Sequence, residues 1–65
     1  SAYERVLIYL HSLKTPGQNS YVLPYSIKQM AEQICLTPEV VSRSLRKLQD
    51  NGVIQRHQRK IKFLE

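Results

Sequence analysis

The sequence predicts one small domain of mixed class, mainly α, in which three helices are followed by a small β-hairpin. Two observations support this class: apolar residues recur at helical spacing in three separate segments, and the last segment alternates apolar with basic residues. A chain of 65 residues buries only about 60% of its unfolded surface. One modest core is therefore expected, with little room for an enclosed catalytic cleft.

The first third of the chain predicts a helix, a loop and one strand. Apolar side chains recur every three or four positions over residues 3–13, which is typical of an amphipathic helix. Residues 14–20 contain a proline, a glycine and an asparagine, so they form a loop. Residues 21–24, with the sequence YVLP, are expected to form a short strand that ends at its proline.

A second helix is expected over residues 27–34. Ser26 is a good N-cap, and Gln29 three residues later completes a capping box, in which each side chain accepts from a backbone N–H group that the helix leaves unpaired. Only two residues, Cys35 and Leu36, separate this helix from the next start signal. The connection is therefore a tight turn.

A third helix begins at Thr37 and Pro38, because threonine is a favoured N-cap and proline fits the first helical position. It continues to Asp50 or Asn51, and Gly52 is expected to end it in a left-handed conformation.

Two short runs, VIQRH and KIKFL, follow the third helix and are joined through Gln58 and Arg59, which indicates a hairpin. Two helices joined by a tight turn and followed by a hairpin have the layout of a winged helix-turn-helix.

The third helix has two chemically distinct faces. At about 100° per residue, Arg43, Arg46 and Asp50 all fall within about 40° of Glu39. The opposite face carries Val40, Val41, Ser44, Leu45 and Leu48. An arginine fork matches guanine and a carboxylate accepts from cytosine, so this polar face could read bases in a major groove. The simpler interpretation is a solvated face on which Glu39 and Arg43, one turn apart, form an ordinary ion pair.

Charge is distributed unevenly along the chain. Residues 1–42 hold three basic and three acidic side chains, whereas residues 43–65 hold seven basic and two acidic ones, which accounts for the net charge of +5. Such asymmetry indicates a polyanionic partner, although basic residues also simply keep small domains soluble.

The motifs LPYSIKQMAEQ and TPEVVSRSLRKLQDNGVI resemble the C-terminal DNA-binding domain of Crp/Fnr-type transcription regulators. Their E-x-x-S-R form is more similar to the Fnr and denitrification-regulator branches than to the cyclic-AMP branch. The resemblance implies that residues 37–51 form the recognition helix, with Arg43 on a guanine, Glu39 on the opposite strand and Ser42 near a thymine methyl group. It also implies a TTGAT-like half-site and phosphate contacts from Ser26, Lys28, Thr37, Arg46, His57 and Arg59.

Three positions depart from the family pattern. Pro38 stands where the cyclic-AMP branch has a further arginine reader. Cys35 stands where glycine is common, so a positive φ there would cost on the order of 1 kcal/mol. Ser44 occupies a usually aliphatic position, which should loosen the core.

Several expectations concern the rest of the protein. Residues 1–2 resemble the remnant of an expression tag, which leaves 3–65 as a DNA-binding domain cut from a longer cytoplasmic regulator. The resemblance implies a homodimer formed through a missing segment, and RNA polymerase as a further partner. No membrane contact is expected, because no apolar run approaches the roughly 20 residues that a membrane span requires. No enzymatic activity, metal site or cofactor is expected in this fragment, because Cys35, His11 and His57 have neither catalytic nor metal-ligand spacing. The competing hypothesis is a winged helix whose basic face binds an acidic protein.

Overall fold

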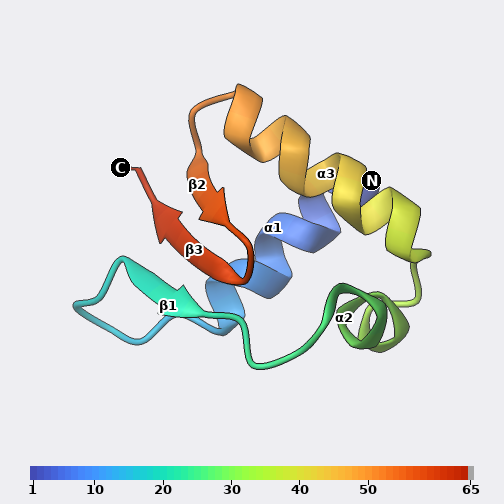
Figure 1. Cartoon of the computed structure of the whole chain (residues 1–65), viewed down its shortest axis with the longest axis horizontal. Coiled ribbons are helices and arrows are strands. Elements are labelled where there is room, and N and C mark those ends of the chain that lie inside the picture. The colour runs from blue at the N-terminus through green and yellow to red at the C-terminus, as the bar shows by residue number, and fades with distance from the viewer. Residues whose placement is uncertain (65) are drawn as a thin grey trace.

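The computed structural model describes residues 1–64 and contains three helices and three short strands. The elements follow in the order α1 (Ala2–Ser12), β1 (Ser20–Val22), α2 (Ile27–Gln33), α3 (Pro38–Asp50), β2 (Ile54–His57) and β3 (Lys60–Phe63). In Figure 1 the strands lie on one side and α2 and α3 on the other, with α1 between them. The predicted winged helix-turn-helix architecture is confirmed.

The helix boundaries follow from their capping residues. Ser26 forms the predicted capping box with Gln29, and the Thr37 side chain accepts from the backbone N–H of Val40 at 3.2 Å. Gly52 follows α3 with φ +73°, as predicted for a left-handed stop.

The first helix begins earlier than expected. It includes Ala2, and Ser1 caps it by accepting from the N–H of Glu4 while the Glu4 side chain accepts from the Ser1 amino group. The expected start of this helix at residue 3 was therefore one residue late, because a serine three positions before a glutamate supplies a complete capping box.

The sheet has a pairing that local patterns did not predict. β1 does not stand alone; it pairs antiparallel with β3, which also pairs antiparallel with β2, so the strand order is β1-β3-β2. β1 also begins at Ser20 and ends at Val22, two residues before Pro24. The hairpin turn is Gln58-Arg59, as predicted, and Gln58 takes φ +56°.

One core holds all six elements together. Its fully buried apolar residues are Val6, Leu10, Leu23, Met30, Ala31, Val41, Leu45, Leu48, Ile54, Ile61 and Phe63. α3 packs against α1, α2 and β2, so three elements fix its orientation. Ser44 is buried among them at 7% exposure, and no buried side-chain nitrogen or oxygen atom in residues 1–64 lacks a hydrogen-bond partner.

Tyr21 links β1 to the end of α1. Its hydroxyl donates to the Leu10 carbonyl at 2.6 Å, and the ring contacts Phe63 at 6.4 Å between centroids. Burial, together with the charge of nearby Tyr9, raises the pKa of Tyr21 to about 12. Between residues 1 and 64, no helix has the length and apolar composition needed to cross a membrane.

Candidate nucleic-acid interface

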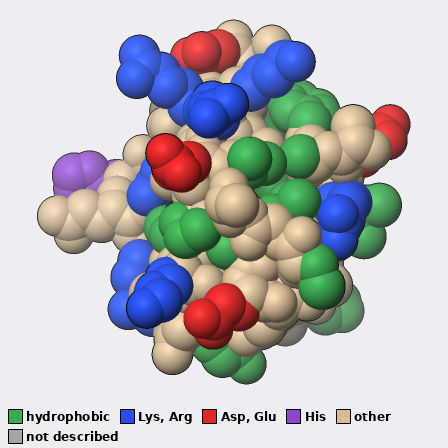
Figure 2. Space-filling model, turned by 90° about the vertical axis from the view of Figure 1, so that its right-hand side faces the viewer, with side chains coloured by type: hydrophobic (Ala, Val, Ile, Leu, Met, Phe, Trp, Pro, Cys, Tyr) green, Lys and Arg blue, Asp and Glu red, His purple; other side chains and the backbone are tan. Residues whose placement is uncertain are grey.

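The two faces of α3 are separated in the structure as the sequence predicts. Val41, Ser44, Leu45 and Leu48 are buried beneath the helix. The exposed residues of the other side are Glu39, Ser42, Arg43, Arg46, Lys47 and Asp50. Figure 2, which looks at the side of the molecule formed by α2 and α3, shows Lys and Arg side chains gathered along its upper edge.

Glu39 and Arg43 do not neutralise each other. Within the described part of the chain, the one ion pair with an N–O distance of 4.0 Å or less joins the Ser1 amino group to Glu4. Both side chains are exposed, so the carboxylate and the guanidinium are available to a ligand. The proposed surface ion pair, which was the simpler interpretation of this spacing, does not form here.

The turn between α2 and α3 is held against α1. Cys35 adopts φ +57°, as expected for a position that often holds glycine, and its side chain is exposed. The guanidinium of Arg5 donates to the Ile34 carbonyl, and the Tyr9 hydroxyl donates to the Gln33 side chain at 2.8 Å. These bonds couple the end of α2, where the turn toward α3 begins, to α1. No local pattern singles out Arg5, since its partner lies 29 positions away.

Two of the predicted phosphate contacts are also helix caps. The hydroxyl oxygens of Ser26 and Thr37 accept from the N–H groups of Gln29 and Val40. The hydroxyl hydrogens remain free to donate to an anion. Lys28, in the first turn of α2, is exposed.

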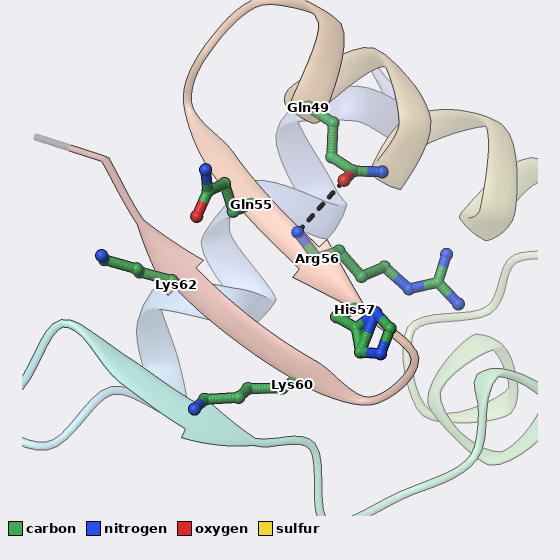
Figure 3. A pocket seen from close by; sticks show the side chains of 6 residues that line it. All are labelled: Gln49, Gln55, Arg56, His57, Lys60 and Lys62. Carbon is green, nitrogen blue, oxygen red and sulfur yellow. Dashed lines mark hydrogen bonds between the residues drawn. The ribbon is translucent and has the colours of Figure 1, made fainter.

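The hairpin is fastened to the rest of the domain at two points. Gln49, near the end of α3, accepts from the backbone N–H of Arg56 at 3.1 Å, which pairs a donor on the free edge of β2 (Figure 3). Arg59 donates from Nε and Nη2 to the Leu23 carbonyl at 3.1 and 2.9 Å. Arg59, predicted to contact phosphate, thus braces the hairpin in this structure.

The hairpin and the end of α3 enclose a shallow hollow of about 420 Å³. Its lining residues are Gln49, Gln55, Arg56, His57, Lys60 and Lys62. Only His57 was predicted as a site residue, and it is exposed at the end of β2. In Figure 3 the Arg56 guanidinium extends toward the helices, whereas Lys60 and Lys62 extend from β3 on the far side of the hairpin. The alternation of Lys60, Ile61, Lys62 and Phe63 indicates that both lysines face outward, but sequence alone does not show what they face.

Potential metal ligands are dispersed. Residues 1–64 hold no group of three or more His, Cys, Asp or Glu side chains placed to bind one ion.

Comparisons with known proteins agree with this geometry. A family model described as the Crp-like helix-turn-helix domain matches residues 4–65. The probable transcriptional regulator flp of Lacticaseibacillus casei is 34% identical over 61 residues, which are 92% of this chain and 28% of that protein. The structure of FixK2 from Bradyrhizobium japonicum matches with a TM-score of 0.87 and 28% identity, over 100% of this chain and 34% of that chain. The chain thus spans about a third of the length of these two relatives. It belongs to the family of Crp-like helix-turn-helix domains.

Proposed function

We propose that this domain binds double-stranded DNA sequence-specifically for a transcription regulator, with α3 in the major groove. The single observation that carries the proposal is the construction of α3. Its apolar face is fixed by three packed elements, while its exposed face presents a carboxylate and guanidinium groups without internal ion-pair partners. A groove about 12 Å wide admits one such helix, and rigid support favours precise contacts with base edges.

The proposed base readers are Glu39, Ser42 and Arg43, which lie in the first half of α3. Arg43 can donate two hydrogen bonds to guanine, and Glu39 can accept from a cytosine amino group on the opposite strand. Ser42 lies beside Arg43 and is assigned to a thymine methyl group. The E-x-x-S-R pattern supports membership of the Fnr and denitrification-regulator branch and a TTGAT-like half-site. Pro38 offers no side-chain donor, so a longer guanine contact pattern is not part of the proposal.

The proposed phosphate contacts surround α3. Lys28 and Arg46 supply charge, the capping hydroxyls of Ser26 and Thr37 donate hydrogen bonds, and His57 approaches the backbone from the hairpin. Such contacts set the register of the helix without carrying sequence information. Arg59 keeps N–H groups beyond the two that it donates to Leu23, so a phosphate contact remains compatible with its bracing role.

The relatives are about three times as long as this chain, which supports a role as one module of a larger regulator. We propose that such a regulator forms a homodimer through its other parts. Two modules would then read half-sites about 34 Å apart, and contact with RNA polymerase would follow on the promoter. The isolated module is expected to bind weakly, because it lacks the effective concentration that a tethered second module supplies.

The test is a titration of the chain with a TTGAT-containing duplex and with a scrambled duplex, repeated over a range of salt concentrations. Of the proposed phosphate contacts, Lys28, Arg46 and Arg59 carry the charge that releases counterions, so log K should fall against log salt with a slope of about −3. Arg43→Ala should cost about 1 to 3 kcal/mol on the TTGAT duplex and relax preference at the guanine. Its matched control, Arg46→Ala, removes the same charge from α3 and should weaken binding to both duplexes alike.

Equal affinity of the unaltered chain for both duplexes, or binding without salt dependence, would contradict the proposal. The alternative of a module that binds an acidic protein would then gain support. The comparisons do not favour that alternative, because the relative that is 34% identical is a probable transcriptional regulator.

A further inference from the structure

The outer face of the sheet carries positive charge without acidic partners. The antiparallel register places two rows of side chains across this face, since directly paired residues point to the same side. The rows are Ser20, Lys62 and Gln55, and Val22, Lys60 and His57. Both lysines are exposed, and neither row contains a carboxylate.

The position of these lysines in the sheet argues against a merely protective role. Lysines commonly prevent sheets from pairing edge to edge, but such lysines belong on edge strands. Lys60 and Lys62 lie on β3, the central strand. A carboxylate directly opposite either lysine would stabilise the sheet, yet glutamine, histidine, serine and valine occupy those positions. The charge is thus left available to an external anion.

This charged face is continuous with the proposed DNA interface. Lys60 and Lys62 line the same hollow as Gln49 of α3 and His57 at the end of β2 (Figure 3). Two residues along a strand advance by about 6.6 Å, which resembles the rise of two nucleotides along one strand of B-DNA. Two separate phosphates could therefore be contacted at once.

We propose that Lys60 and Lys62 bind phosphates of the duplex that flanks the half-site on the hairpin side. The proposal rests on the function proposed above and extends its footprint beyond the bases that α3 reads. DNA fits this face better than a protein does, because protein interfaces have a desolvated core with aromatic and other apolar residues. The six residues lining the hollow are all polar, and Val22, which is 66% exposed, is the one apolar side chain in the two rows.

The test compares two duplexes with the same half-site. One continues for about one helical turn, or about 10 base pairs, beyond the half-site on the hairpin side, and the other ends at the half-site. On the long duplex, Lys60→Gln and Lys62→Gln should each lower the steepness of the log K against log salt plot by about 0.9. The double variant should lower it by about 1.8, so the loss of affinity between about 50 and 200 mM salt shrinks roughly 12-fold. On the short duplex, the variants should match the unaltered chain.

Lys14→Gln is the matched control, since it removes the same charge. The Lys14 ammonium lies 4.8 Å from the ring centre of Phe63, a residue of the inner face of the sheet. The slope of log K against log salt for the Lys14→Gln variant should equal that of the unaltered chain on both duplexes. Melting temperatures should confirm that the exposed Lys60 and Lys62 variants remain folded.

An unchanged slope for the double variant on the long duplex would overturn the inference, and so would an equal change on both duplexes. Retained DNA binding together with loss of binding to poly-L-glutamate would assign this face to acidic proteins and also overturn it. Failure of the unaltered chain to bind either duplex would instead contradict the proposed function itself.

Discussion

Replacing Arg59 by alanine tests whether this side chain braces the hairpin or serves only to contact DNA. Its guanidinium donates twice to the carbonyl of Leu23, a residue 36 positions away whose side chain is buried. The backbone bond from the Leu23 N–H to the Arg59 carbonyl, at 2.7 Å, survives in Arg59→Ala. The substitution therefore isolates the contribution of the guanidinium.

The magnitude follows from the geometry. A hydrogen bond with a charged partner contributes about 1.5 to 3 kcal/mol. Both donors of Arg59 share one acceptor at a partly buried site, so the lower value, about 1.5 kcal/mol, is expected. For a domain of this size, that loss lowers the melting temperature by roughly 6 to 12 °C.

The assay is thermal unfolding followed by far-UV circular dichroism in the absence of DNA. Lys60→Ala is the control, because it removes a neighbouring positive charge from an exposed side chain. It should leave the melting temperature of the free domain unchanged. If Arg59→Ala melts at the same temperature as the Lys60→Ala control, the bracing role is refuted and Arg59 reverts to a phosphate contact only.

Three further substitutions test other features of the fold. Gln49→Ala should destabilise the domain by about 0.5 to 1.5 kcal/mol in urea unfolding, because the backbone N–H of Arg56 on the edge of β2 loses its acceptor. The variant should also weaken binding to all duplexes alike. An effect no larger than that of the exposed control Gln55→Ala would contradict this reasoning. Cys35→Gly should raise stability by up to about 1 kcal/mol, because Cys35 has φ +57°, and a loss of stability would show that the turn is unstrained. The raised pKa of Tyr21, about 12, means that the folded state retains the phenolic proton after the unfolded state loses it near pH 10. Stability should therefore fall as pH rises from about 10 to 12, and Tyr21→Phe should reduce that fall, leaving the part due to Tyr9, whose pKa burial also raises. An identical pH dependence in the variant would contradict the assignment.

Local sequence signals predicted most of the fold because the features concerned are themselves local. The capping box of Ser26 and Gln29 and the proline at the start of α3 depend on residues no more than four positions apart. The left-handed conformation of Gly52 follows from short-range sterics, whereas that of Cys35 opposes them and is imposed by the tight turn between α2 and α3.

Features that depend on distant partners could not be read in this way. Tyr21 pairs with Ile61 across the sheet, and Arg59 reaches back to Leu23, so neither contact leaves a periodic pattern in the sequence. Spacing alone also failed to predict whether Glu39 and Arg43 form an ion pair: they are one turn apart, but no N–O distance between them is 4.0 Å or less. An i, i+4 pair is worth only a few tenths of a kcal/mol, so spacing permits it without enforcing it.

The most direct test of base reading by α3 is a two-dimensional amide NMR titration of the labelled chain with the TTGAT duplex. The largest shift changes should fall on Glu39, Ser42 and Arg43, with smaller changes at Lys28 and His57. Shift changes centred on the apolar surface of α1 around Ile8, which is 68% exposed, with α3 unaffected, would contradict the account.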